Sequence, residues 1–320
     1  MGFATQSQAV TRLWRRHSCL PSRHSCRDLR NHPLLRSAQK LCALCLAACA
    51  AFLAPLAGQS LPLEPPHDSG AGITGAFEGW FKNPDGSFSL LLGYFNRNQK
   101  EDLDVPIGPN NRIEPGGPDR GQPTHFLRGR QWGLFAVNVP SDFGKNKITW
   151  TITANGKASV IPASLHPDYE ISPLVEAAVG NTPPVLRFEQ NGPSVQGPRG
   201  MIVERSAAVG TPLELTVWAS DDAKFTSSSS SRPKNLGSPV ALRWTKFRGP
   251  GNVKFSNEKP QIEKIEDKTA AFSGKATTTA TFSEPGDYVL HLLANDYSGE
   301  GGSGFQCCWT NAEVKVRVNP

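Results

Sequence analysis

Beyond its first 59 residues, the chain has little cysteine, no excess of charge and no long hydrophobic run. Residues 60–320 hold two of the seven cysteines, which excludes a fold held together by several disulfides. They contain 26 Lys and Arg against 27 Asp and Glu, so this body lacks the cationic excess of nucleic-acid-binding proteins. Glycine and proline are abundant, at 30 and 27 of 320 residues, which favours a turn-rich β protein over a helical bundle.

The sequence also lacks the short motifs of common enzymes. It contains no G-x-S-x-G, H-E-x-x-H or Walker loop, and these motifs place a nucleophile, a zinc ion or a phosphate. The four histidines that follow residue 59 are widely spaced. We therefore predict a non-catalytic protein with no catalytic residue and no organic cofactor.

A hydrophobic run with a basic flank lies near the N-terminus. Eight Lys and Arg residues lie between positions 12 and 40, and residues 41–58 are apolar or small. This pattern is typical of an export signal, and the run is near the lower limit for spanning a bilayer. We predict that 1–59 is a cleaved signal peptide, with an uncleaved anchor or a lipoprotein attached at Cys49 as alternatives. The protein is expected to be exported (periplasmic, secreted or envelope-anchored) and to touch a membrane only through this segment, if it is retained.

The remaining chain is predicted to form a linker and two β domains. Residues 60–70 are rich in proline and read as a linker. Residues 71–165 show short alternating strands, and Asn155-Gly156 is a strong hairpin signal. Residues 103–125 are so rich in Gly and Pro that we expect a long surface loop. Residues 166–184 are predicted to connect the domains, with one short helix at 173–179.

Residues 185–320 are predicted to form the second domain from about seven short strands. Apolar side chains alternate with polar ones in each segment, and seven such strands in this length indicate a two-sheet sandwich. Trp244 lies on an apolar face and is expected in the core. Gly286-Asp287-Tyr288 fits a tyrosine corner, in which the hydroxyl bonds back to the chain. The predicted fold class is all-β, with two antiparallel β-sandwich domains, the second immunoglobulin-like.

Three stretches of the second domain carry a resemblance to a known family. They are 241–253, with ALRWT and GPG; 278–290, with EPGDYVL; and 314–320. They resemble the polycystic-kidney-disease-type (PKD) and cadherin-like immunoglobulin-fold modules of secreted bacterial proteins. The Trp-Asp-Phe-Gly-Asp-Gly segment of PKD modules is absent, because Trp244 is followed by Thr245-Lys246-Phe247. The whole body also resembles an uncharacterised exported bacterial family, and the resemblance implies a sandwich fold without an activity.

Two acidic pairs are expected at one end of the second sandwich. Asp221 and Asp222 end one predicted strand, and Asn295 and Asp296 end another. Their oxygens are the ligands that Ca²⁺ prefers, so these four residues are candidate calcium ligands. The alternative is that they close turns with their own backbone.

Cys307 and Cys308 are the only cysteines left if the leader is removed. Because adjacent residues of a strand point to opposite faces, a bond between them requires a turn. We predict a disulfide between these neighbours, with a bond between chains, or one buried and one free thiol, as alternatives. The last strand would then begin near Asn311.

The predicted function is binding, adhesion or envelope scaffolding. The expected partner is a protein or glycan ligand in the cell envelope, and not a nucleic acid. The alternative is a hydrolase, or an accessory carbohydrate-binding module, acting on extracellular polymers, with 103–125 or 295–310 as its site. Trp80 and Trp218 are predicted on polar faces, where they would cover a domain contact or stack on sugar rings.

Overall fold

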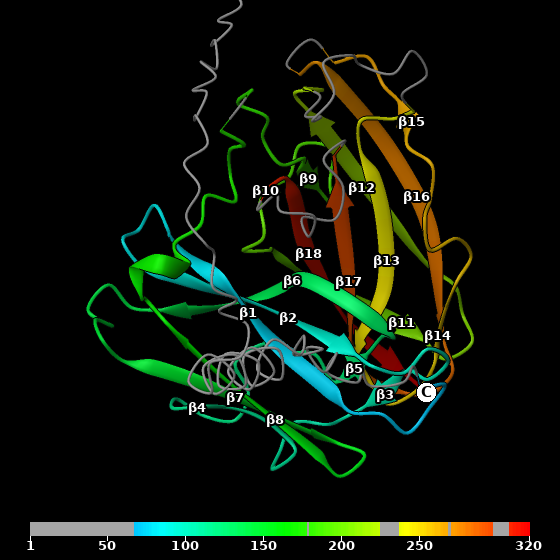
Figure 1. Ribbon diagram of the computed structural model, residues 1–320. Helices are drawn as coiled ribbons and strands as arrows, with labels where there is room; N and C mark the ends of the chain where they lie inside the picture. The colour runs from blue at the N-terminus through cyan, green and yellow to red at the C-terminus, as the bar shows by residue number, and fades with distance from the viewer. Residues whose placement is uncertain (1–66, 178, 225–236, 268–269, 297–306) are drawn as a thin grey trace, which may run out of the picture. The chain divides into compact units, whose positions relative to one another are not determined.

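The computed structural model describes residues 67–177, 179–224, 237–267, 270–296 and 307–320 (Figure 1). The predicted export signal and most of the linker lie outside these residues. The stretch Glu64–Pro320 forms one compact unit, and its described elements are strands except for one 3₁₀ helix, η2 (Pro167–Tyr169). The all-β class is therefore confirmed. In this part of the chain, no helix has the length and apolar character needed to cross a membrane.

The first sandwich is built from two three-stranded antiparallel sheets. One has the order β1-β2-β6 and the other the order β4-β7-β8. The strands are β1 (Ile73–Lys82), β2 (Phe88–Asn96), β4 (Asn111–Glu114), β6 (Gly129–Val139), β7 (Lys147–Ala154) and β8 (Lys157–Ser164). Tyr94 from one sheet and Trp150 from the other are buried between them. The predicted turn joins β7 to β8, with φ values of 50° at Asn155 and 73° at Gly156, as this hairpin type requires.

Residues 103–125 are more ordered than a surface loop. They contain β4 and parts of the short pair β3 (Leu103–Asp104) and β5 (His125–Phe126), and they bury Ile113 in the core. Asn111 explains this order. Its side-chain amide donates to the carbonyls of Val105 and Pro123, and its oxygen accepts from Trp150 Nε1 at 3.0 Å. These buried polar bonds fix a segment that lacks apolar alternation, which is why the sequence pattern did not reveal it.

The second sandwich has a six-stranded and a four-stranded sheet. The first has the order β10-β9-β12-β16-β14, with β15 also on β16, and the second has the order β11-β18-β17-β13. The seven predicted segments all contain strands: β9 (Val185–Arg187), β11 (Ile202–Ala208), β12 (Leu213–Asp221), β13 (Ala241–Arg248), β16 (Phe272–Phe282), β17 (Gly286–Asn295) and β18 (Trp309–Asn319). The six-stranded sheet also contains three further short strands: β10 (Ser194–Gln196), β14 (Val253–Phe255) and β15 (Glu263–Lys264). The prediction is wrong in two details. β18 begins at Trp309 rather than near Asn311, and β11 pairs with β18 in parallel rather than antiparallel.

The two predicted structural residues lie inside this immunoglobulin-like sandwich. Trp244 is fully buried in its core. The hydroxyl of Tyr288 donates to the carbonyl of Glu284 at 2.9 Å and accepts from the N–H of Gly251 at 3.0 Å. A side chain at Gly249 would overlap the Tyr288 ring, so the glycine makes room for the tyrosine corner.

The two sandwiches contact each other through the outer faces of β1-β2-β6 and β11-β18-β17-β13. A small hydrophobic cluster joins them: Phe81, Leu91, Ile171, Leu293 and Trp309. Trp309 Nε1 and Asn311 Nδ2 both donate to the carbonyl of Gly133, at 3.3 and 2.8 Å. Arg243 donates to Gln131 Oε1 at 3.0 Å. Each sheet buries only part of its outer face in this junction, and the domain boundaries within the unit stay a prediction.

The connecting segment 166–184 does not form the helix predicted at 173–179 in its described residues. The N–H of Glu176 bonds to the carbonyl of Asn181 at 2.8 Å, and the N–H of Gly180 bonds to the carbonyl of Glu176 at 2.9 Å. These bonds close a turn in place of a helix. The 3₁₀ helix η2 forms earlier, where Pro167 occupies its first turn, a position that tolerates the missing N–H of proline.

Candidate functional site

The four candidate calcium ligands lie at one end of the second sandwich, as expected. Asn181 donates from Nδ2 to Asp296 Oδ2 at 2.5 Å. The next residue, Thr182, donates from its N–H and its hydroxyl to Asp222 Oδ2, at 3.2 and 3.0 Å. Asp221 and Asn295 are the last residues of β12 and β17. The connecting segment therefore links the two acidic pairs, and we call this region the Asn181 pole.

At this pole Asp221, the last residue of β12, and Asp222, which follows it, both close turns. Asp221 Oδ1 accepts from the N–H of Ala223 at 2.7 Å, and Asp222 Oδ1 accepts from the N–H of Lys224 at 3.0 Å, as in the alternative interpretation. Over the described residues, no group of three or more His, Cys, Asp or Glu side chains is arranged to hold a metal ion. A calcium site at the pole stays a prediction.

Three oxygens at the pole are buried without a hydrogen-bond donor among the described residues. They are Asn181 Oδ1, Asp221 Oδ2 and Asn295 Oδ1. Burial raises the pKa of Asp221 to about 7, and the neighbouring Asp296 and Asp222 add to the rise. A buried carboxyl without a counter-charge favours its neutral form.

Cys307 and Cys308 are bonded to each other immediately before β18. Both are buried, and their sulfurs lie 3.9 and 3.4 Å from the carbonyl oxygen of Asn181. Disulfide sulfurs carry no hydrogen to donate, so these are packing contacts. The glycine-rich loop before the pair lies outside the described residues. The disulfide thus packs under the pole and does not line an open surface.

Two of the widely spaced histidines lie beside carboxylates. His125 Nδ1 lies 2.9 Å from Asp104 Oδ1. His166 Nδ1 lies 3.5 Å from Asp168 Oδ2 on the exposed 3₁₀ helix. Asp104 Oδ1 also lies 3.4 Å from Lys246 Nζ. Within the described part of the chain, neither histidine is grouped with further metal-binding side chains.

The prediction that Trp80 lies on a polar face is wrong. Trp80 is buried in the core of the first sandwich, and its Nε1 donates to the carbonyl of His166 at 2.8 Å. A register shift between Phe77 and Gly79 inverts the alternation of β1 before Trp80, and a bulge of this kind leaves no clear mark in a sequence. Trp218 is half-buried, with Lys275 Nζ 5.5 Å from its ring centroid.

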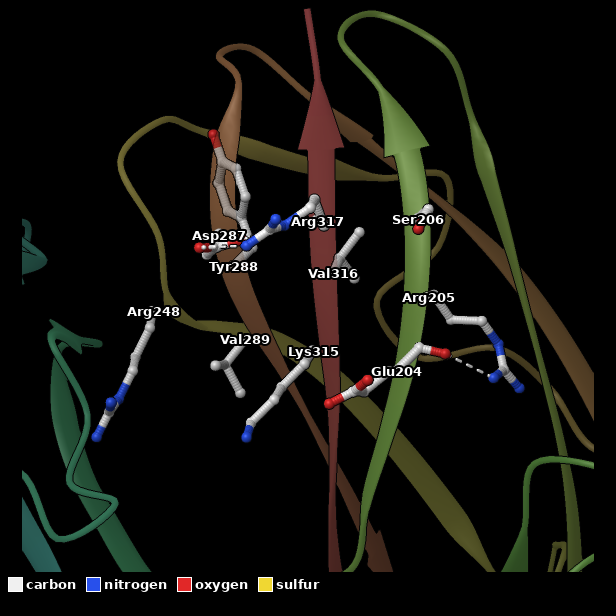
Figure 2. A pocket seen from close by; sticks show the side chains of 10 residues that line it. All are labelled: Glu204, Arg205, Ser206, Arg248, Asp287, Tyr288, Val289, Lys315, Val316 and Arg317. Atoms are coloured by element: carbon white, nitrogen blue, oxygen red, sulfur yellow. Dashed lines mark hydrogen bonds and ion pairs between the residues drawn. The ribbon is translucent and has the colours of Figure 1, made fainter.

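A basic trough that the sequence analysis missed lies on the open part of the sheet β11-β18-β17-β13. A cavity of about 790 Å³, the sheet cavity, lies over these strands (Figure 2). It is lined by Glu204, Arg205, Ser206, Arg248, Asp287, Tyr288, Val289, Lys315, Val316 and Arg317. A second cavity of about 510 Å³, the junction cavity, lies further along β11 and β18, against β6 of the first sandwich. It includes Arg120, Arg199, Ile202 and Glu313. We call the two cavities together the trough.

Strand register explains how these charges meet. Glu204, Lys315 and Val289 are direct neighbours across β11, β18 and β17, and Ser206, Arg317 and Asp287 form the next row. Because side chains alternate along a strand, Glu313, Lys315 and Arg317 all point to the trough side of β18. In Figure 2, Lys315 lies between Arg248 and Glu204.

The lining of the trough is more basic than the body that carries it. Six Lys or Arg side chains line the two cavities, against the three acids Glu204, Asp287 and Glu313. Arg248 forms a two-pronged bond to Asp119, at 2.9 Å in both contacts, and Arg317 binds Asp287 at 3.1 and 3.4 Å. Since residues 60–320 are nearly neutral, this local excess is a site where an anion would concentrate.

One acid of the trough has an unusual environment. Burial raises the pKa of Glu313 to about 7, although the nearby Arg248 and Lys315 favour its charged form. In contrast, the pKa of Asp119 is lowered, because this carboxylate accepts hydrogen bonds from Arg248. Neither environment could be predicted from the sequence, because the spacing of Glu313, Lys315 and Arg317 is typical of the solvated face of a half-buried strand.

The comparisons with known proteins assign no function to the trough or to the Asn181 pole. No protein-family model and no curated protein matches the chain. Solved structures to which it is similar include domains 4 and 5 of the S-layer protein SbsC (12% identity, 78% of this chain and 98% of that one, TM-score 0.21). Another is the D00-D0 domain of intimin (14% identity, 76% of this chain and 98% of that one, TM-score 0.22). A third comprises zebrafish RET cadherin-like domains 1 to 4 (12% identity, 72% of this chain and 48% of that one, TM-score 0.23). TM-scores this low carry no argument about function.

Proposed function

We propose that the protein is exported and non-catalytic, and that it binds an anionic ligand of the cell envelope in the trough. The observation that carries this proposal is the gathering of six basic side chains along two adjoining cavities of a nearly neutral body. Five of the six are arginines, whose planar forks match carboxylate, sulfate and phosphate groups. In this proposal the second sandwich is a module of the PKD or cadherin-like kind.

The shape of the trough favours an extended ligand. The sheet cavity covers the β11 rows of Glu204 and Ser206, and the junction cavity begins at the row of Ile202. Five strand residues correspond to about 14 Å, so several charged units of a polymer can bind at once. The two aromatic residues of the lining, Tyr288 and Phe135, are both buried, which disfavours ligands held by ring stacking.

The junction gives a reason for a scaffold role. Asn311, Trp309 and Arg243 of the second sandwich bond directly to the backbone or side chains of β6. The trough needs both sandwiches, because β6 forms one wall of the junction cavity. A ligand that fills the trough would therefore bind to both sandwiches.

A second candidate function is a hydrolase of extracellular polymers. One observation favours it: Glu313 is a carboxyl with a raised pKa in a cavity bordered by the predicted loop site at Arg120 and Gly121. Such a group can act as a general acid near neutral pH.

Binding to dextran sulfate, with neutral dextran for comparison, tests the proposal. We expect the double variant Lys315→Glu/Arg317→Glu to bind at least tenfold more weakly than the wild type, because attraction becomes repulsion. The matched control is Lys254→Glu with Lys264→Glu, which makes a similar charge change on exposed strands β14 and β15. Equal loss in both variants would show unspecific attraction and would refute the trough as the site.

Two further measurements complete the test. Release of reducing ends from an acidic polysaccharide would support the hydrolase instead. Fractionation of cells that express the tagged full chain tests export, and a full-length cytoplasmic pool would contradict it.

A further inference from the structure

We infer that Glu313 makes anion binding in the trough depend on protons, so that the trough binds its ligand more tightly when Glu313 is neutral than when it is ionised. The inference rests on the proposed function, because it concerns the regulation of the same site. It adds a residue whose charge the ligand would sense.

The position of Glu313 gives it this influence. It lines the junction cavity, and two residues later on the same face of β18 Lys315 lines the sheet cavity. Its direct neighbours across the sheet are Ile202 on β11 and His291 on β17. A ligand that runs along the trough must pass this carboxyl.

Charged and titratable groups from every neighbouring element surround Glu313. They are Arg248 from β13, Lys315 from β18, Glu204 from β11, His291 from β17, Asp119 and Arg120 from the segment before β5, and Arg199 from the segment before β11. Burial, and next the nearby Arg243, lower the pKa of His291 to about 4, so it is neutral at pH 6 and above. Asp119 is held ionised by Arg248.

Glu313 itself changes charge in the neutral range. Burial raises its pKa to about 7, so it is mostly neutral at pH 6 and mostly ionised at pH 8. The pH change therefore adds one negative charge to a lining that otherwise has six basic and two acidic groups. At the distances within one cavity, a single charge alters the affinity for an anion by about tenfold in a partly solvated site.

The linkage must also work in reverse. An anion bound in the trough favours the protonated form of Glu313, so binding near pH 7 takes up a proton. This uptake is measurable on the wild-type protein by calorimetry in buffers of different ionisation enthalpy.

Dissociation constants for dextran sulfate at pH 6 and pH 8, at one ionic strength, test the inference. Sulfate esters keep their charge over this range, so a change in affinity belongs to the protein. We expect the wild type to bind about tenfold more weakly at pH 8. Glu313→Gln should bind equally at both pH values, with the affinity of the wild type at pH 6. Glu204→Gln, an exposed acid of the same trough, should keep the pH dependence.

The outcomes separate the inference from the proposed function. If Glu313→Gln keeps the wild-type ratio, or if the wild type binds without proton uptake, Glu313 is not the switch although the trough binds anions. If the wild type binds dextran sulfate at neither pH, the proposed function itself fails. Should Glu313→Gln not fold, proton uptake by the wild type still decides the matter.

Discussion

Replacement of Asp221 by asparagine is expected to stabilise the protein at high pH and not at low pH. Asp221 is 4% exposed, and Oδ2 has no donor among the described residues. Burial, with Asp296 and Asp222 nearby, raises its pKa from 3.8 to about 7. The folded state therefore binds a proton more tightly than the unfolded state, and the wild type loses stability as pH rises from about 4 to 7.

The size of the effect follows from this rise. At about 1.4 kcal/mol per pH unit, ionised Asp221 costs the folded state about 4 kcal/mol above pH 7. Asparagine has no charge, and its oxygen can still accept from the N–H of Ala223, but its amide also needs partners, which offsets about 1–2 kcal/mol. We expect Asp221→Asn to unfold at higher urea concentration at pH 8, with a gain of about 2–3 kcal/mol, and to be about 1–2 kcal/mol less stable than the wild type near pH 4, where Asp221 is neutral and the cost of the amide remains.

Urea denaturation at pH 4, 6 and 8 in EDTA measures this dependence. Asp222→Asn is the matched control, because the Asp222 carboxylate accepts from Thr182 and Lys224 and its loss should destabilise the fold. A gain that does not grow with pH, or a loss of stability at pH 8, would refute the reasoning. Repeating the series with millimolar calcium tests the metal prediction: a bound ion would stabilise the wild type and would reverse the advantage of Asp221→Asn.

Three other predictions concern the second sandwich. Trp244→Ala should lower the free energy of unfolding by about 3–5 kcal/mol, and an unchanged urea midpoint would contradict its burial. Tyr288→Phe should cost about 1–2 kcal/mol, because the hydroxyl makes two hydrogen bonds; a loss below a few tenths would argue against the tyrosine corner. Intact mass without reductant should show a monomer two protons lighter than the dithiol; two alkylatable thiols or a reducible dimer would reject the bond between Cys307 and Cys308.

The sequence predicted the strands of the second sandwich well because each one buries a single face. Apolar residues at every second position, as in β18, carry that information directly. The same rule failed for Trp80, where a bulge in β1 inverted the pattern. It also failed for 103–125, where the side-chain bonds of Asn111 replace an apolar face.

The trough could not be predicted from the sequence. It depends on strands that lie far apart in the chain, since Glu204 and Lys315 meet through the parallel pairing of β11 with β18. Arg248 and Asp119 meet across the two sandwiches. Patterns within one segment contain no information on such register. The location of the acidic pairs of the Asn181 pole could be predicted, because strands of a sandwich end at one of its two ends.

Gly133 limits how the two sandwiches can evolve or be engineered. Its φ is +46°, and a Cβ at this position would overlap the ring of Trp309. Any larger residue would have to displace β18, which carries Glu313 and Lys315. The second sandwich produced alone would expose Trp309 and Leu293 to water and would be prone to self-association. The two sandwiches together are therefore the natural unit for expression, and position 133 should be left unchanged in any redesign.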